Sequence, residues 1–252
     1  MRKEDVVVHP SRDADSLCAA FKREGCPICT VVLEHMDMAM NTWNYEGFTD
    51  VEHRHTLIRS GGFCPLHTWQ LAQRNNAFQL ALIYREVLTD FLATLDRNET
   101  QQQVAVLHRP GREPGWKTWL SKWFQPKTAQ FPQAVELYAR CPLCRTRANI
   151  EQRVTEVLIE QLQLEEIRTL LCQSTGLCRQ HFMQTSRMTL ERSPQQQQVL
   201  IACQQACLQR TLEEVKELIR KHDYHAATES RGDEMTAWRR AAEFSVGNPG
   251  IR

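Results

Sequence analysis

The sequence contains no long hydrophobic run. The first ten residues include only three consecutive apolar ones, far fewer than the hydrophobic region of a signal peptide, and no later stretch is long enough to span a membrane. An excess of charge is absent too, because the formal net charge of the 252 residues is +1 at pH 7. Such a balance creates no global field that would draw the chain to nucleic acid or to an anionic membrane. We therefore expect a soluble, cytoplasmic protein without a nucleic-acid-binding surface.

The motifs of common enzyme classes are also missing. The sequence has no nucleophile–base set, no glycine-rich phosphate-binding loop and no paired-carboxylate pattern that stands out. Nothing in the residues therefore supports an enzymatic activity, and we expect a non-catalytic protein. A hydrophobic content of 42% is nevertheless sufficient for a folded core.

Cysteine, by contrast, is abundant, and six of the ten cysteines belong to two motifs that each occur twice. In both halves of the chain a Cys-x-x-Cys motif is followed by a Cys-x-x-His motif, with 34 intervening residues in the first half and 33 in the second. This matched spacing indicates an internal repeat. The residues are Cys26, Cys29, Cys64 and His67 in the first half and Cys141, Cys144, Cys178 and His181 in the second half.

Three thiolates and one imidazole form a complete tetrahedral shell for zinc. We therefore predict two Zn²⁺ ions per chain, one bound by the four ligands of the first half and one by the four ligands of the second half. Four protein ligands leave no open position for water, so the predicted role is structural rather than hydrolytic. The residues leave two alternatives open: an iron–sulfur cluster with one histidine ligand, and buried thiols that bind no metal and merely reflect a duplication.

The cytoplasm keeps thiols reduced, so we expect the cysteines to be metal ligands or buried thiols rather than disulfides. Thiolates at helix N-termini have a lowered pKa and react with oxidants. Either Cys-x-x-Cys motif could then form a disulfide and release its zinc, which would make the protein a redox or zinc-release sensor. Outside the motifs, Cys203 and Cys207 fall within the apolar stripe of a predicted helix, and we expect them to pack in the core.

Apolar residues recur at helical spacing in both halves, for example from Leu80 to Leu95 and from Leu200 to Ile219, and no useful alternating strand pattern is present. A proline follows the first cysteine of each Cys-x-x-Cys motif, which suits the first turn of a helix. Gly62 and Gly176 precede the Cys-x-x-His motifs and would end one helix before the next begins. We predict an all-α fold of two similar lobes, with the ligand pairs at helix N-termini.

Clustered Gln, Gly and Pro residues separate the two halves. Such a composition buries little apolar surface, so we predict a flexible linker over residues 97–130. The expected organisation is a first zinc-binding lobe over residues 1–96, a second over residues 131–225, and a C-terminal tail with a short helix over residues 226–252.

The predicted linker contains a tryptophan-rich segment. Trp116, Trp119, Leu120 and Trp123 share one face if the segment is helical. One interpretation is that the segment folds back over the protein's own core, which we favour because three tryptophans are unfavourable in water. The other is that it docks on a partner protein or at a lipid interface.

Several segments together carry a resemblance to a known family. They are the Cys-Pro-Leu-Cys motif at Cys141, the segment from Thr175 to His181, a long helix after each, and the closing segment from Trp238 to Ala241. In these features the chain resembles the uncharacterised bacterial DUF6062 proteins. The resemblance implies a bacterial, cytosolic, metal-binding helical protein and implies no activity. We accordingly expect a structural or adaptor module with a protein partner.

Overall fold

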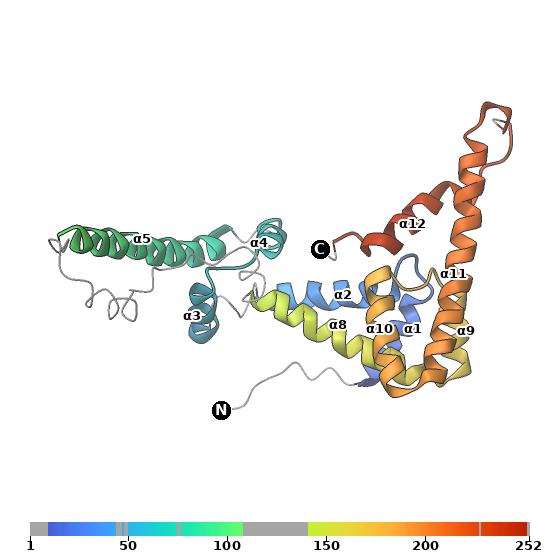
Figure 1. Ribbon diagram of the computed structural model, residues 1–252, viewed down its shortest axis with the longest axis horizontal. Helices are drawn as coiled ribbons and strands as arrows, with labels where there is room; N and C mark the ends of the chain where they lie inside the picture. Colours follow the sequence, from blue (N-terminus) through green and yellow to red (C-terminus); the bar gives the residue numbers. More distant parts are fainter. Residues whose placement is uncertain are drawn as a thin grey trace, which may run out of the picture. The chain divides into compact units, whose positions relative to one another are not determined.

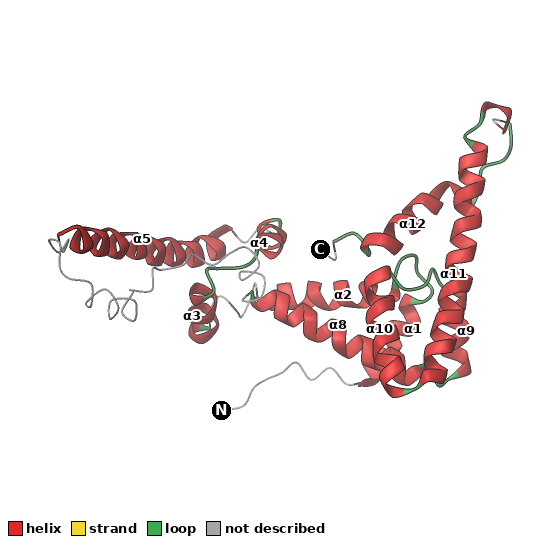
Figure 2. Ribbon diagram, viewed as in Figure 1, coloured by secondary structure: helices red, strands yellow, loops and turns green. Residues whose placement is uncertain are grey.

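The computed structural model describes residues 10–43, 47, 50–74, 77–107, 141–226 and 228–250 of the chain. Within these residues the regular structure is helical and no strand occurs (Figure 2). The all-α prediction is therefore confirmed for the described part of the chain. No helix in this part is long and apolar enough to cross a membrane.

The helices of the described residues follow one another as labelled in Figure 1. In chain order they are α1 (Pro10–Ala20), α2 (Pro27–Thr42), α3 (Val51–Arg59), α4 (Pro65–Ala72), α5 (Ala77–Leu107), α8 (Pro142–Gln161), α9 (Glu165–Gln173), α10 (Arg179–Arg192), α11 (Pro194–Lys221), the 3₁₀ helices η2 (Tyr224–Ala226) and η3 (Asp233–Thr236), and α12 (Ala237–Val246).

The chain divides into two compact units that do not follow its two sequence halves. Unit 1 combines Met1–Ala39 with Thr146–Arg252, and unit 2 consists of Met40–Arg145. Each unit therefore contains segments from both halves. This division differs from the expected lobes at residues 1–96 and 131–225, because α2 and α8, which open the two halves, each begin in one unit and end in the other.

Helix α11 is the centre of unit 1, where it packs against α9, α10 and α12 (Figure 1). Its inward face carries Leu200, Cys203 and Cys207, none of which is more than 3% exposed. These positions recur at helical spacing, as an amphipathic helix requires. The helix begins at a capped end, because the side chain of Ser193 accepts a hydrogen bond from the N–H of Gln196.

A buried polar cluster joins α1, α2 and α8 within unit 1. Asp13 is fully buried and accepts a hydrogen bond from Nε of Arg153 at 2.6 Å. Nη2 of Arg153 lies 3.2 Å from Nδ1 of His35, and Nε2 of His35 lies 3.7 Å from Oδ1 of Asp13. Burial lowers the pKa of His35, so the folded protein favours its neutral imidazole.

Unit 2 is organised by the packing of α3 against α5. Leu57 of α3 and Ile83 of α5 are at most 1% exposed and belong to its core. Helix α5 continues to Leu107, whereas the sequence predicts a linker from residue 97. The difference arises because the first helix-breaking residue after this point is Pro110, so the glutamine-rich stretch before it extends the helix.

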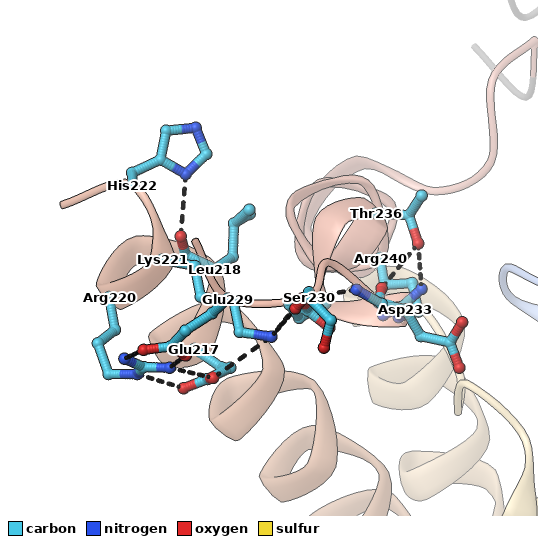
Figure 3. A network of polar contacts seen from close by, with 12 residues as sticks. Glu217, Leu218, Arg220, Lys221, His222, Glu229, Ser230, Asp233, Thr236 and Arg240 are labelled. Carbon is cyan, nitrogen blue, oxygen red and sulfur yellow. Dashed lines mark hydrogen bonds and ion pairs between the residues drawn. The ribbon is translucent and has the colours of Figure 1, made fainter. Parts of the chain in front are cut away.

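Polar contacts tie the C-terminal segment of the chain to α11 (Figure 3). Nζ of Lys221 donates a hydrogen bond to the carbonyl of Ser230 at 2.6 Å. It donates another to the carboxylate of Glu234 at 2.9 Å. Nε of Arg240, on α12, donates to Glu214 of α11 at 3.1 Å. The short helix expected in this region is α12, and the contact of Arg240 with Glu214 holds it against α11 within unit 1.

Candidate metal centres

The eight predicted ligands form two clusters, and each cluster combines the Cys-x-x-Cys motif of one half with the Cys-x-x-His motif of the other. In each cluster the candidate ligand atoms all lie within 4.8 Å of one another. The pairing predicted within each half is therefore wrong. Site 1, in unit 1, consists of Cys26, Cys29, Cys178 and His181, and site 2, in unit 2, consists of Cys64, His67, Cys141 and Cys144.

The length of the chain between the ligands does not prevent a Cys-x-x-Cys motif from pairing with the Cys-x-x-His motif of the other half. Cys29 and His181 are 152 residues apart, against 35 for the Cys29–Cys64 pair of the expected site. The entropy of closing a loop grows only with the logarithm of its length, so the longer connection costs only about 1 kcal/mol more. Helix packing therefore decides which motifs meet, and the two Cys-x-x-His motifs are chemically equivalent partners.

In site 1 the histidine faces the thiols with Nδ1. Nδ1 of His181 lies 3.3 Å from Sγ of Cys29, 3.3 Å from Sγ of Cys178 and 3.5 Å from Sγ of Cys26. The sulfur atoms of Cys29 and Cys178 are 3.7 Å apart. None of the four side chains is more than 3% exposed, so site 1 is closed to solvent.

Site 2 has the same arrangement. Nδ1 of His67 lies 3.2 Å from Sγ of Cys64, 3.4 Å from Sγ of Cys144 and 3.5 Å from Sγ of Cys141. The sulfur atoms of Cys64 and Cys144 are 3.5 Å apart. Cys144 is partly exposed, whereas the other three residues are buried.

These separations fit the edges of a zinc tetrahedron. Zinc–sulfur bonds of about 2.3 Å and zinc–nitrogen bonds of about 2.0 Å would place sulfur atoms about 3.8 Å from one another and about 3.5 Å from the nitrogen. The sulfur–nitrogen separations of 3.2–3.5 Å and the sulfur–sulfur separations of 3.5–3.7 Å come close to these values. Three sulfurs and one nitrogen also suit a soft or borderline metal and not calcium or magnesium.

Each ligand pair lies at a helix N-terminus, as the proline and glycine positions predict. Pro27 and Pro142 are the first residues of α2 and α8. Cys64 and Cys178 are the N-caps of α4 and α10, with nearly equal φ values of −65° and −66°. The free N–H groups and the positive end of the helix dipole at these positions favour thiolates.

The thiols of site 1 differ in how readily they lose their protons. Hydrogen bonds from Cys26 and Cys29 hold the pKa of Cys178 well below its usual range, whereas burial raises the pKa of Cys26. Burial opposes protonation of His181, but its hydrogen bonds to Cys178 and Cys29 outweigh this effect and raise its pKa to about 10. A divalent cation that displaced these protons would balance the thiolate charges directly.

Site 2 shows the same contrast between a thiol with a lowered pKa and a thiol with a raised pKa. A hydrogen bond from Cys141 lowers the pKa of Cys64 against the effect of burial. The same hydrogen bond, together with burial, raises the pKa of Cys141 to about 11. Each site therefore contains a thiol whose proton a metal must displace.

Two side-chain amides hold the ligand turns of site 1. Oδ1 of Asn248 accepts a hydrogen bond from the N–H of Cys26 at 2.8 Å. Gln204 of α11 holds the turn before Cys178. Its Oε1 accepts a hydrogen bond from the N–H of Leu177, and its Nε2 donates one to the carbonyl of Leu177, both at 2.9 Å. Sequence reasoning missed both residues. The available signal was Gln204 itself, a glutamine directly after Cys203 at the edge of the apolar stripe of α11.

The two glycine turns before the Cys-x-x-His motifs are tightly packed. Gly62 has a φ of +95°, and a Cβ there would lie 2.8 Å from the ring of Tyr84, whose hydroxyl is 2.6 Å from Oγ1 of Thr68. Gly176 has a φ of +80°, and a Cβ there would lie 2.9 Å from Cβ of Cys207. Both turns therefore require glycine for backbone conformation and for space.

Glu151 of α8 lies beside the histidine of site 1. Its Oε1 is 4.0 Å from Nε2 of His181 and 3.5 Å from Nε of Arg147. A carboxylate on this side of the ring favours a proton on Nε2. A metal that displaced the proton on Nδ1 would therefore bind the ring through Nδ1, on the side of the thiols.

The structure corrects the expectation that all the cysteines are reduced. Cys172 of α9 and Cys203 of α11 form a disulfide, with their Cα atoms 4.4 Å apart. The reason is the packing of α9 on α11, which brings together two residues 31 positions apart in the sequence. Cys207, one turn further along α11, is a buried free thiol, as expected of a core residue.

The tryptophan-rich segment over residues 116–123 lies outside the described residues. The structure therefore tests neither of its two interpretations.

Comparison with known proteins places the chain in a family. The model of DUF6062, a family of unknown function, matches residues 12–249. An "Uncharacterized 23.9 kDa protein in xynA 3'region" of Caldicellulosiruptor sp. (strain Rt8B.4) is 21% identical over 229 residues, which cover 90% of this chain and 97% of that protein. No solved structure matches significantly. Because the family match includes both candidate sites and nearly the whole chain, the protein belongs to the DUF6062 family.

Proposed function

We propose that this protein binds two zinc ions, one at site 1 and one at site 2, and acts as a structural or interaction module. The observation that carries the proposal is the meeting of eight candidate ligands in two sets whose ligand atoms all lie within 4.8 Å of one another. Burial of thiols alone does not explain why a histidine nitrogen faces three sulfur atoms in both sets. Coordination of a tetrahedral metal ion explains this arrangement.

A structural role follows from the donor sets. Each site supplies four protein ligands, so a tetrahedral zinc ion would have no open position for water or substrate. At site 1 the ligands are also closed to solvent. Zinc would therefore act by joining helix N-termini, and the sites themselves give no support to hydrolysis.

The order of the ligands along the chain makes the two sites nested. Site 1 joins the turn at Cys26 to the turn at Cys178, and both motifs of site 2 lie between them in the sequence. Zinc at site 1 would close unit 1, which is built from two separate segments. Structural zinc contributes on the order of 10 kcal/mol to folding, comparable with the net stability of a typical domain, about 5–15 kcal/mol. We expect unit 1 to unfold without its ion.

The order of the helices supports an internal repeat. Each half contains a Cys-x-x-Cys helix (α2 or α8), a short helix (α3 or α9), a Cys-x-x-His helix (α4 or α10) and a long helix (α5 or α11), in this order. We infer a duplication in which the two copies have exchanged their Cys-x-x-His partners.

A protein partner in the cytoplasm suits the chain best. The net charge of +1 favours neither nucleic acid nor an anionic membrane. A reducing compartment would keep the six ligand thiols available for metal. An adaptor of this kind would present the helix surfaces that its two ions hold in place.

A thiol-based redox sensor is the second candidate function, and the partial exposure of Cys144 favours it. Oxidation of the Cys141 and Cys144 thiolates to a disulfide gives two electrons to an oxidant such as peroxide and releases the zinc ion. The buried site 1 should resist the same oxidant, because oxidation needs an accessible thiolate.

Elemental analysis of anaerobically purified protein, combined with native mass spectrometry, tests the metal assignment. We expect two zinc ions per chain and no iron. Protein that contains iron and acid-labile sulfide, or no metal, would overturn the proposal. Exposure to mild peroxide in the presence of a chromogenic chelator then separates the two functions, since a structural module keeps its zinc and a sensor releases one ion that a thiol reductant allows to rebind.

A further inference from the structure

Unit 1 contains a cavity of about 250 Å³ that belongs to neither candidate metal site. It lies between the turn after α1, the end of α9, and helices α11 and α12 (Figure 1). The basic side chains that line it are Lys22 and Arg23 after α1, Arg210 on α11 and Arg240 on α12. Pockets for drug-sized ligands have volumes of about 300–1,000 Å³, so this cavity fits a smaller molecule.

Two of the four basic side chains have carboxylate partners. Arg240 lies 3.5 Å from Oε1 of Glu24 and donates a hydrogen bond to Glu214 at 3.1 Å. These are the two carboxylates that line the cavity, and a single guanidinium binds both. Arg23 forms an ion pair with Glu34 of α2.

The charges of Lys22 and Arg210 are not neutralised in this way. Neither residue forms an ion pair with a carboxylate in the part of the chain that the structure describes. Nη2 of Arg210 donates a hydrogen bond to the carbonyl oxygen of Ser174 at 2.7 Å. A carbonyl has no net charge, so this contact positions the guanidinium without neutralising it. The other N–H groups of Arg210 remain as donors for a ligand.

The floor of the cavity adds no negative charge. Cys207 is only 1% exposed, and burial raises the pKa of its thiol although the guanidinium of Arg210 opposes this effect. The thiol is therefore neutral near pH 7. Gln173 and Thr211 add an amide and a hydroxyl to the lining. An anion in this cavity would meet two uncompensated cations among neutral polar groups.

One wall of the cavity is fixed by the two turns that lead into site 1. Oγ1 of Thr175 donates a hydrogen bond to the carbonyl oxygen of Gly25 at 2.6 Å. Gly25 directly precedes Cys26, and Thr175 lies three residues before Cys178. The donors around the cavity are therefore held in place before a ligand arrives, which lowers the entropy cost of binding.

We propose that this cavity binds the phosphate group of a small phosphorylated molecule through Lys22 and Arg210. A phosphate monoester carries a charge of about −1.5 to −2 at pH 7, which matches these two cations. Its tetrahedral oxygens accept hydrogen bonds from donors that approach from different elements, whereas the two oxygens of a carboxylate lie in one plane. The planar fork of an arginine is also well suited to phosphate. The rest of the ligand lies beside Gln173 and Thr211.

Isothermal titration calorimetry of the full chain in phosphate-free buffer tests the proposal. The probes are glycerol 3-phosphate, inorganic phosphate and the dicarboxylate succinate. We expect one glycerol 3-phosphate to bind per chain, with inorganic phosphate competing for the same site and succinate binding more weakly. The absence of binding, or equal affinity for succinate and glycerol 3-phosphate, would overturn the proposal.

The variant Lys22→Gln tests the assigned residue without disturbing the fold, because Lys22 is exposed. Loss of one charge-assisted hydrogen bond should weaken the binding of glycerol 3-phosphate by about tenfold or more. The control is Lys216→Gln on α11, which removes the same charge outside the cavity from a residue paired with Glu213 at 2.9 Å. It should leave the Kd unchanged. Equal weakening by both changes would indicate a diffuse effect of net charge and overturn the proposal.

Nuclear magnetic resonance locates the bound probe. In the wild type, glycerol 3-phosphate should shift the backbone amide signals of Ser174 and Thr211, and Lys22→Gln should reduce these shifts at the same probe concentration. Shifts confined to residues outside the cavity would contradict the assignment. The zinc content is measured in the same samples, so a failure of phosphate binding in protein that contains two ions is distinguished from a failure of the metal assignment.

Discussion

Sγ of Cys26 and Nδ1 of His181 lie 3.5 Å apart, although the two residues are separated by 155 positions in the sequence. The contact joins the start of α2 to the start of α10. The side-chain oxygen of Asn248 accepts a hydrogen bond from the N–H of Cys26 and holds that turn, and Gln204 of α11 holds the turn at Leu177. Four distant parts of the chain therefore converge on site 1, and its geometry depends on residues that are not ligands.

Replacement of Gln204 by Ala should destabilise unit 1 and weaken zinc binding at site 1. The change leaves the buried N–H and carbonyl of Leu177 without their partner, which should lower the free energy of unfolding by about 2–4 kcal/mol. Loss of a residue that orients a ligand turn should also lower zinc affinity at site 1 by about 10- to 100-fold. Denaturant titration and competition with a chromogenic chelator measure the two effects. The control is Gln205→Ala, because Gln205 is exposed on the same helix. Equal effects of both changes would contradict this role of Gln204.

The disulfide between Cys172 and Cys203 should stabilise unit 1 through its loop. Cross-linking two residues 31 positions apart restricts the unfolded chain, and a loop of this length corresponds to about 3–4 kcal/mol. The variant Cys172→Ser/Cys203→Ser should lose that stability in oxidising buffer, as measured by urea denaturation. A mild reductant should lower the stability of the wild type and leave the variant unchanged. Identical stability of the two proteins in oxidising buffer would show that the bond is not formed in solution.

The buried imidazole of His35 should make the protein less stable as the pH falls below about 6.5. The folded pKa of His35 is lowered by burial, and Arg153 of α8 also lowers it, while Asp13 of α1 and the neighbouring Glu34 act in the opposite direction. The unfolded chain therefore binds a proton that the folded chain resists, so stability is complete above the unfolded pKa and is lost below it.

The variant His35→Gln isolates this effect from other acid-sensitive groups, including the metal ligands. Between pH 7 and pH 5 its free energy of unfolding should fall less steeply than that of the wild type, whereas His55→Gln, at an exposed position, should leave the slope unchanged. A steeper fall in the His35→Gln variant would reverse the sign and contradict the buried neutral histidine.

The sequence predicts the local structure of the sites well because local rules determine it. Proline at the first helical position, as at Pro27, and glycine with a positive φ, as at Gly62, place the ligand turns at helix starts. The pairing of the turns has no local signal. Cys64 and Cys178 belong to Cys-x-x-His motifs with the same ligand types, and the small difference in loop entropy does not select between them.

Long-range contacts explain the other differences. Nothing near Cys172 in the sequence indicates Cys203 as its partner, because the bond depends on the packing of α9 on α11. Gln204 and Asn248 reach backbone groups that are 27 and 222 residues away. Residues whose role arises from tertiary packing in this way cannot be identified from the spacing of motifs.

Zinc counting in two double variants tests the exchange of motifs between the halves most directly. Cys26→Ser/Cys178→Ser removes two ligands of site 1 and should leave site 2 intact, so native mass spectrometry should detect one zinc ion per chain. Cys26→Ser/Cys64→Ser removes one ligand from each site and should leave no tightly bound zinc. Sites that closed within each half would give the opposite result, with no zinc in the first variant and one ion in the second, and that result would contradict the account.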